Sequence, residues 1–341
     1  MAEGYLRPPP PTLWPPPSKP PEVINYPGLK HDKRTQSDCL QGRARHNDPM
    51  LASWPVISVD DWSIAGLESQ GQHPHNWLKH PSQTRTWLFK PARPERDRSL
   101  SEDIVEKLGS ELAQLVGVPA APVELAIQDG VRGALVEDVR LPYWELQAGQ
   151  ALMPEVVPDY DPNDPGRRGH NVHSIRQALA RFAAPPESTM PTPFGAFDAF
   201  AGYLLFDALI AHGDRHDRNW AVIVPPPGAQ EAEALCPSFD HAASLGFTLT
   251  EGARAQHIRD GTVASWANHG YARRFEHRPG TRWQTLVDLA ESAIELCRPG
   301  TREYWRERIS VGRVWFRWGP GRGCTGALRN HTLLHSRARH G

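Results

Sequence analysis

The chain has 341 residues, of which 39% are hydrophobic, so it is long enough to bury one large core or two smaller ones. Its formal net charge of −1 excludes a strong overall attraction to nucleic acid or to an anionic membrane. There is no run of about 18 apolar residues and no signal-peptide pattern, and the four cysteines have neither metal-site spacing nor disulfide density. These features predict a cytoplasmic protein without a membrane span.

Residues 1–50 are predicted to form a largely disordered leader. Prolines cluster at Pro8 to Pro11 and again at Pro15 to Pro17, a pattern that favours an extended polyproline conformation. A docking ligand for another protein is the alternative interpretation. It would require a partner to order the segment, so we favour the leader.

The first predicted strands are Val56 to Val59 and Ile64 to Gly66. The polar turn that follows, Ser69 to Gln72, contains Gly71 and could place backbone N–H groups against phosphates. A single glycine is a weak signal, and its main support is its position before the next strand.

That next strand ends at a lysine. Thr86 to Phe89 is apolar and aromatic, and Lys90 precedes the terminator Pro91. Lysine occurs at only six positions in this arginine-rich chain. An ammonium here can reach the α- and β-phosphates of a nucleotide, although a plain surface lysine is the ordinary alternative.

A helix is predicted from Ser99 to Gly117. Ser99 and Glu102 fit a capping box, and apolar residues recur at helical spacing at Ile104, Leu108, Leu112, Leu115 and Val116. In protein kinases a glutamate on such a helix clamps the strand lysine. The candidates are Glu102, Glu106 and Glu111. Because Glu106 lies away from the Leu108/Leu112 stripe while Glu111 flanks it, periodicity alone does not select Glu106.

A β-hairpin is predicted next. The apolar runs Val123 to Ile127 and Val131 to Val136 flank Gln128-Asp-Gly130, and Asp-Gly between such runs is a strong turn signal. Residues 137–141 would then connect to the second half of the chain. In kinases the backbone of such a connection holds adenine.

The most informative segment is a polar loop between a predicted helix, Phe197 to Ala211, and a predicted strand, Trp220 to Val224. In this loop Asp214 precedes Asn219 by five positions, and Asp240 follows 21 positions later. Kinase catalytic loops use this spacing for an aspartate that orients the acceptor hydroxyl, an asparagine that holds Mg²⁺ and a later aspartate that holds the metals. The spacing therefore predicts phosphoryl transfer from ATP.

Two other interpretations of this loop remain open. A solvated turn capped by aspartate is the ordinary one. The dipeptide His216-Asp217 could instead belong to a binuclear hydrolase, with Asp240 and either His173 or His212 completing the metal site. The kinase interpretation accounts for more of the residues.

The order of these segments resembles the HipA-like serine/threonine kinase family, from about Ser58 to Ile309. The matching motifs are Leu88-Phe-Lys90-Pro91, Glu106 to Pro119, Arg132 to Asp138, Gly213-Asp-Arg-His-Asp-Arg-Asn219 and Phe239-Asp240. The loop is also similar to that of phosphoinositide kinases. The phosphate loop, residues 67–74, departs from the family pattern because it has few small residues.

The resemblance implies a role for each candidate residue. Asp214 would be the catalytic base, and His216 would lie near the phosphates or brace the loop. Asn219 and Asp240 would bind Mg²⁺. The remaining contacts to ATP would come from Lys90 paired with Glu106, from Gly71 in the phosphate loop, and from Glu137 and Val139 beside the adenine.

Together these inferences predict an α+β, two-lobed protein-kinase-like fold with an N-lobe at 51–138, a C-lobe at 139–318 and a basic flexible tail at 319–341. Further C-lobe helices are expected at Val172 to Phe182, Trp283 to Cys297 and Glu303 to Ile309. The predicted function is ATP- and Mg²⁺-dependent transfer to serine or threonine of a protein substrate, with an antitoxin-like partner implied by the resemblance alone. A lipid or small-molecule kinase, a nucleotide-binding pseudokinase and the metal-dependent phosphohydrolase are the alternatives.

Overall fold

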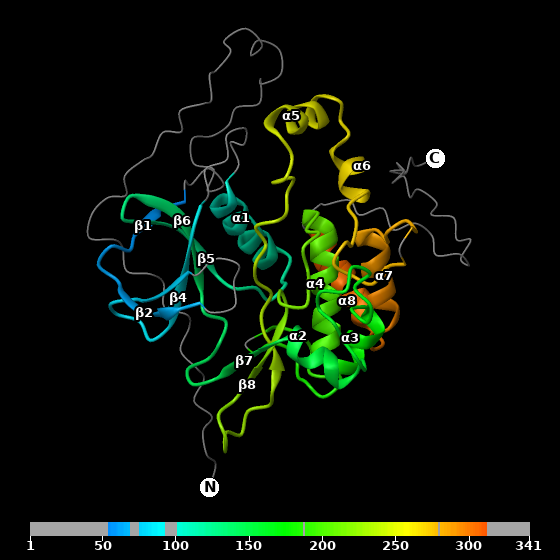
Figure 1. Cartoon of the computed structure of the whole chain (residues 1–341), viewed down its shortest axis with the longest axis horizontal. Helices are drawn as coiled ribbons and strands as arrows, with labels where there is room; N and C mark the ends of the chain where they lie inside the picture. Colours follow the sequence, from blue (N-terminus) through cyan, green and yellow to red (C-terminus); the bar gives the residue numbers. More distant parts are fainter. Residues whose placement is uncertain (1–53, 69–74, 93–100, 187, 279, 312–341) are drawn as a thin grey trace, which may run out of the picture.

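The computed structural model describes residues 54–68, 75–92, 101–186, 188–278 and 280–311. A sheet built early in the chain stands beside a mainly helical part built later (Figure 1). The predicted leader, the basic tail and Gly71 lie outside the described residues. The two-lobed α+β prediction is therefore confirmed for the part of the chain between the termini.

The early sheet has six strands in the order β1-β5-β6-β4-β3-β2. The strands are β1 (Val56–Ser58), β2 (Ser63–Leu67), β3 (Asn76–Lys79), β4 (Thr86–Pro91), β5 (Val123–Gln128) and β6 (Val131–Glu137). Only β1 and β5 pair in parallel. The predicted hairpin β5–β6 is present, and both turn residues have positive φ, 51° at Asp129 and 77° at Gly130, as its two-residue turn requires.

Helix α1 (Glu102–Leu115) packs on this sheet, but not through the predicted face. Its N-cap is Ser101, not Ser99, which lies outside the described residues. Leu108 and Leu112 are only half-buried, and Leu115 is 66% exposed. The predicted apolar stripe faces the core only at its C-terminal end, where Val116 is buried and Leu112 packs against the largest cluster.

The buried side of α1 is largely polar, and two of its side chains have specific partners. Lys107 Nζ donates to the Val123 carbonyl at 2.7 Å, and Ser110 Oγ donates to the Ala121 carbonyl at 2.8 Å. These buried hydrogen bonds to the segment that leads into β5 outweigh the pattern of leucines, and the spacing of apolar residues does not reveal them.

The later part contains a small antiparallel sheet and most of the helices. Its elements are β7 (Glu145–Ala148), α2 (Gly149–Leu152), the 3-10 helix η2 (Met153–Glu155), α3 (Val172–Ala178), α4 (Ala196–Ile210), β8 (Ala221–Val224), β9 (Ala234–Leu235), α5 (Glu251–Arg259), α6 (Val263–Asn268), α7 (Leu286–Glu295) and α8 (Thr301–Val311). The predicted helices and strand are all present with ends shifted by a few residues. Among the described helices, none is both long and apolar enough to cross a membrane.

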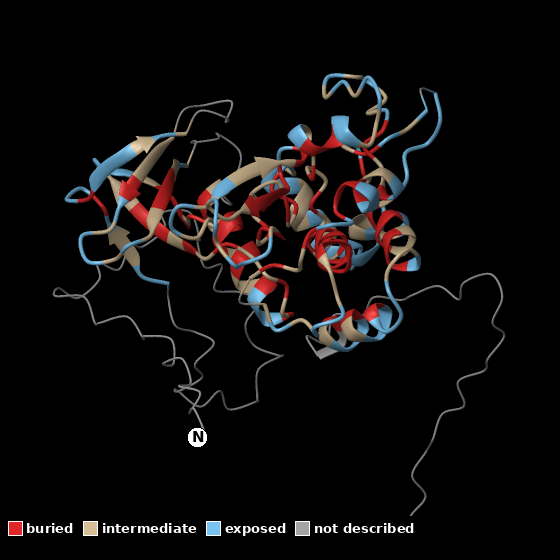
Figure 2. Cartoon of the chain, turned by 90° about the horizontal axis from the view of Figure 1, so that it is seen from below, coloured by how far each residue is buried: buried red, intermediate tan, exposed pale blue. Residues whose placement is uncertain are grey.

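Helix α4 forms the axis of the largest core, and all but one of its residues are buried. Figure 2 shows this concentration of buried residues where the later helices meet. A helix that is apolar on all sides must be surrounded, and α7 supplies its most extensive helical contact. The segment that leaves α4 at its C-terminus therefore starts from a rigid support.

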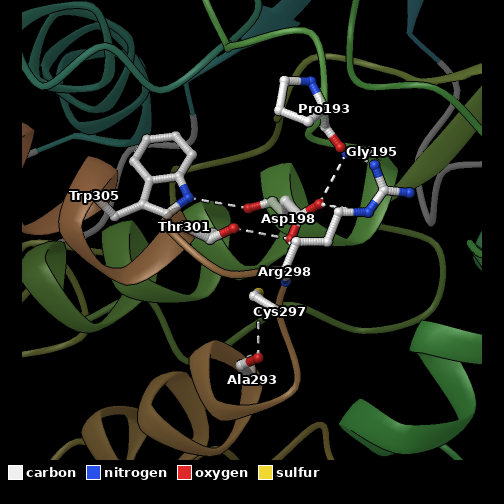
Figure 3. Close-up of polar contacts among 8 residues, drawn as sticks. All are labelled: Pro193, Gly195, Asp198, Ala293, Cys297, Arg298, Thr301 and Trp305. Atoms are coloured by element: carbon white, nitrogen blue, oxygen red, sulfur yellow. Dashed lines mark hydrogen bonds and ion pairs between the residues drawn. The ribbon is translucent and has the colours of Figure 1, made fainter.

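The start of α4 is anchored by Asp198, whose side chain is buried (Figure 3). One carboxylate oxygen accepts hydrogen bonds from the Arg298 amide at 2.9 Å and from the Thr301 hydroxyl at 3.0 Å. The indole of Trp305 donates to the Asp198 carbonyl at 3.0 Å. Helix α8 is thereby fixed to the first turn of α4.

A glycine allows this close approach of α8. A Cβ at Gly202 would lie 2.1 Å from the Trp305 ring, which is far inside contact distance. The fully buried ring thus occupies the place of a side chain on α4.

Candidate functional site

The loop after α4 is folded around the backbone of Asp214. Helix α4 ends with Ala211 in the left-handed conformation, at φ 54°. The Asp214 carbonyl accepts hydrogen bonds from the His216 amide at 2.7 Å and from Asn219 Nδ2 at 2.9 Å. Because the Asn219 side chain uses its Nδ2 nitrogen as the donor here, its Oδ1 oxygen remains available to bind a metal ion.

A buried ion pair that the sequence analysis missed holds this loop to α4. Arg215 donates to both carboxylate oxygens of Asp207, at 2.9 and 2.6 Å, and to the Asn219 carbonyl at 2.8 Å. Both side chains are 1% exposed. The sequence signal for this pair was Asp207, which lies within a largely apolar helix. A buried carboxylate needs a cationic partner.

Lys90 and Asp240 meet across the two parts of the molecule. The Lys90 Nζ atom, at the end of β4, lies 2.9 Å from Asp240 Oδ1. Burial opposes the charge on Lys90, but Asp240 and then Glu106 outweigh it and raise the pKa of the ammonium. In turn Lys90 holds the pKa of Asp240 well below its usual range. The pair is therefore fully charged at neutral pH.

The backbone of Asp240 is strained, with φ at 62°. A left-handed conformation is uncommon for a residue that is not glycine and often marks a functional position. The adjacent buried His241 accepts or donates a 2.8 Å hydrogen bond with Ser238, and its ring fills the space beside Gly109 of α1. The strain at Asp240 is thus held by packing on both sides.

Glu106 does not make the predicted contact with Lys90. Its carboxylate is buried, and neither oxygen has a well-formed hydrogen bond in the described structure, although the amides of His241 and Ala242 lie nearby. Burial raises the pKa of Glu106, while Lys90 works in the opposite direction. In the structure Lys90 pairs with Asp240 instead.

The other glutamates of α1 do not take that place. Glu111 pairs with Lys107 at 2.7 Å, one turn along the helix. The charge of Glu106 contributes to raising the pKa of Lys90. The assignment of Glu106 as the partner of Lys90 stays a prediction.

The connection between the two parts lies beside an apolar cluster. The Glu137 side chain points away to Arg85, at 2.7 Å, and its amide donates to the Pro122 carbonyl at 2.9 Å. Val139 and Phe239 both pack against the N-terminal cluster of Leu88, Ala121, Val123, Ala134 and Val136 and against a second cluster from β8 and β9. Val139 thus marks an apolar seam between sheet and helical part.

Asp214 is paired with an arginine that the sequence analysis did not single out. Arg274 Nε donates to Asp214 Oδ1 at 2.6 Å. His170 Nε2 accepts from the Trp220 indole at 3.2 Å, so its Nδ1 carries the proton and donates to the Arg274 carbonyl at 2.7 Å. Burial lowers the pKa of His170 to about 4, which keeps it neutral. His170 therefore fixes the backbone from which Arg274 reaches the loop.

His216 lies near both aspartates. Burial lowers its pKa, while Asp214 and Asp240 act in the opposite direction. Its Nδ1 accepts from the Arg218 amide at 3.2 Å. The ring is thus oriented by a hydrogen bond within the loop itself.

The binuclear metal site does not form in the described part of the chain, where no group of three or more His, Cys, Asp or Glu side chains is placed to hold a metal ion. Asp217 accepts from the Tyr160 hydroxyl at 2.8 Å instead. His173 is exposed on α3, and His212 is fully buried. The residues proposed as metal ligands of a hydrolase are therefore not brought together in the described structure.

No known family profile and no curated protein sequence matches this chain. Its fold is similar to that of the Helicobacter pylori proinflammatory kinase CtkA, with a TM-score of 0.52 and 14% identity over 75% of this chain and 92% of that one. A looser match is HipA of Shewanella oneidensis MR-1 in its complex with HipB and operator DNA, with a TM-score of 0.33 and 14% identity over 73% and 63% of the two chains. That second match is too loose to bear on any conclusion. The chain therefore has a protein-kinase-like fold.

Proposed function

We propose that this protein transfers the γ-phosphoryl group of ATP to the hydroxyl of serine or threonine in a protein substrate. The observation that carries the proposal is the meeting of Lys90 and Asp240 beside the loop that holds Asp214 and Asn219. These residues come from separate segments, yet Asp214 and Asp240 both act electrostatically on His216. This is the set of groups that phosphoryl transfer requires.

The ligands fit magnesium. The Asn219 Oδ1 oxygen and the Asp240 carboxylate are hard oxygen donors, and two such groups together with nucleotide phosphates are a usual Mg²⁺ environment. When bound, the metal neutralises charge on the phosphates. Lys90 would supply the compact positive charge for the other phosphate oxygens.

The apolar seam at Val139 and Phe239 is the proposed adenine site. The backbone of Glu137 and Val139 would recognise the base edge, since the Glu137 side chain is already engaged by Arg85. In such a site, backbone groups provide specificity for the base and apolar side chains provide the contact area.

Asp214 is the proposed base. Its carboxylate would accept the proton of the acceptor hydroxyl, and the neighbouring Asn219 and Arg215 contacts hold its backbone in place. Arg274 contacts only the Oδ1 oxygen of Asp214, so the Oδ2 oxygen would take the proton.

The test is incubation of the full chain with γ-labelled ATP and bacterial lysate, with and without Mg²⁺. We expect Mg²⁺-dependent label on serine or threonine, absent with Asp240→Asn. If label is recovered only in extracted lipid or in small molecules, the phosphate acceptor is one of these and not a protein. Nucleotide binding without transfer to any acceptor would make the chain a pseudokinase.

Metal binding should depend on the nucleotide. Asp240 pairs with Lys90 at 2.9 Å, so Mg²⁺ on its own must compete with an ion pair and should bind weakly. We expect calorimetric titration to show at least tenfold tighter Mg²⁺ binding with a non-hydrolysable ATP analogue, as is usual where phosphates complete the metal shell. Two transition-metal ions retained per chain through purification would instead support the phosphohydrolase.

Glu106→Gln should slow transfer by about tenfold or more without unfolding the protein. Once ATP and Mg²⁺ engage Asp240, Lys90 needs another carboxylate, and Glu106 is buried beside it. Transfer rates and thermal unfolding of the full chain would be compared with those of Glu111→Gln, which loses only a pair with Lys107. An equal loss of activity in the two variants would show that Glu106 has no specific role in transfer.

We also propose the lobe boundaries at 51–138 and 139–318, since β6 ends at Glu137 and the apolar seam begins at Val139. An antitoxin-like partner stays a prediction of the family resemblance alone.

A further inference from the structure

A group of stacked arginine and aromatic side chains lies after α6. We call it the arginine–aromatic patch, and its members are Tyr271, Arg273, His277, Arg282 and Trp283. The Arg273 guanidinium lies 5.2 Å from the Trp283 ring centre, and that of Arg282 lies 5.7 Å from the Tyr271 ring centre. The two aromatic rings are themselves 6.1 Å apart. The guanidinium groups are therefore held in defined positions.

The two backbone segments that carry the patch are joined to each other. Tyr271 forms an antiparallel bridge with Thr285, and the Ala272 amide donates to the Gln284 carbonyl at 2.9 Å. The Leu286 amide, at the start of α7, donates to the Gly270 carbonyl at 2.8 Å. The patch is thus preformed on the scaffold, which lowers the entropy cost of binding a ligand.

The patch is next to the proposed base. A Cβ at Gly213 would lie 3.3 Å from the Tyr271 carbonyl, so this segment runs directly against the residue before Asp214. Arg274, the neighbour of Arg273, pairs with Asp214 at 2.6 Å. A chain whose hydroxyl reaches Asp214 would place its flanking residues over the patch.

The charges of the patch are available. Arg273 and Arg282 are exposed, and in the part of the chain that the structure describes neither has a carboxylate partner. The nearby Glu276 is already used by Asn171 Nδ2 and by the Gly169 amide. An aromatic ring covers one face of each guanidinium. The N–H edge of the guanidinium can therefore bind a carboxylate with two parallel hydrogen bonds.

We propose that the arginine–aromatic patch binds acidic residues beside the acceptor serine or threonine, so that the substrate of the proposed kinase is an acidic peptide segment. The inference rests on the proposed function. It names the substrate class that this same site would select.

The surroundings favour a peptide over a nucleic acid. A nucleic acid needs contacts to several successive phosphates, whereas the patch presents two stacked guanidinium groups close together. Two guanidinium groups suit a short acidic segment.

Direct binding is the first measurement. A fluorescein-labelled, serine-containing peptide with flanking Asp and Glu would be titrated with the full chain, beside the same peptide carrying Asn and Gln. We expect about fivefold to tenfold tighter binding of the acidic peptide, which falls as salt is raised. The double variant Arg273→Gln/Arg282→Gln should remove this preference. The matched control Arg176→Gln/Arg306→Gln, on exposed faces of α3 and α8, should retain it.

Transfer rates on the same peptides are the second measurement, and they separate the two proposals. If neither peptide is phosphorylated but the acidic one binds through the patch, the proposed kinase activity fails and the surface assignment stands. Equal binding of both peptides, or equal loss of preference in the control variant, overturns the patch assignment. Tighter binding of single-stranded RNA than of the acidic peptide, lost in the patch variant, would also overturn it.

Discussion

Asp214→Asn is expected to abolish phosphoryl transfer while leaving ATP binding within about twofold. The amide keeps the shape of the side chain but cannot accept the proton of the acceptor hydroxyl, and removal of such a base costs on the order of 10²- to 10⁴-fold in rate. The backbone contacts of the loop involve the Asp214 carbonyl, not its carboxylate, so they should survive. The substitution also breaks the pair with Arg274.

Single-turnover transfer and nucleotide titration would measure the two effects separately. Asp61→Asn, an exposed residue in the turn between β1 and β2, is the control for loss of one carboxylate. An Asp214→Asn protein with full activity would show that another group takes the proton. Loss of ATP binding together with activity would mean that the change disturbs the loop as a whole.

Asp207→Ala should be the most destabilising substitution near the site, at about 3–5 kcal/mol. It would leave the Arg215 guanidinium buried with its charge uncompensated, since both side chains are 1% exposed. Arg215 also holds the Asn219 carbonyl, so the loop would lose its attachment to α4 at the same time.

Urea unfolding monitored by tryptophan fluorescence would quantify the loss. Glu155→Ala, which breaks the exposed pair with Arg181 at 2.8 Å, is the matched control and should change the free energy of unfolding by no more than about 1 kcal/mol. A similar, small loss in both variants would show that the Asp207–Arg215 pair does not hold the loop.

The parts of the site that follow from local spacing were predictable from the sequence. The Asp214–Asn219 loop, its flanking helix and strand, and the Asp129-Gly130 hairpin each depend on residues close together in the chain. Helix α1 shows the limit. Its buried face is decided by hydrogen bonds from Lys107 and Ser110 to the segment that follows the helix, and no periodicity within the helix records them.

Contacts between distant segments were not predictable for the same reason. Lys90 pairs with a residue 150 positions away, and Arg274 reaches Asp214 across 60 positions. The sequence pattern singled out Lys90, Asp240 and Asp214 as candidate site residues. It carried no information about which partner each side chain takes.

The packing of Trp305 against Gly202 also determines when this part of the core can fold during synthesis. Helix α4 leads directly into the loop that carries Asp214, yet its first half is completed by the Trp305 ring and by hydrogen bonds from residues about a hundred positions further along. On the ribosome, the segments of the proposed site emerge long before α8 does. Since that part of the core cannot close until α8 arrives, a nascent chain should gain the proposed activity only after α8 has been synthesised.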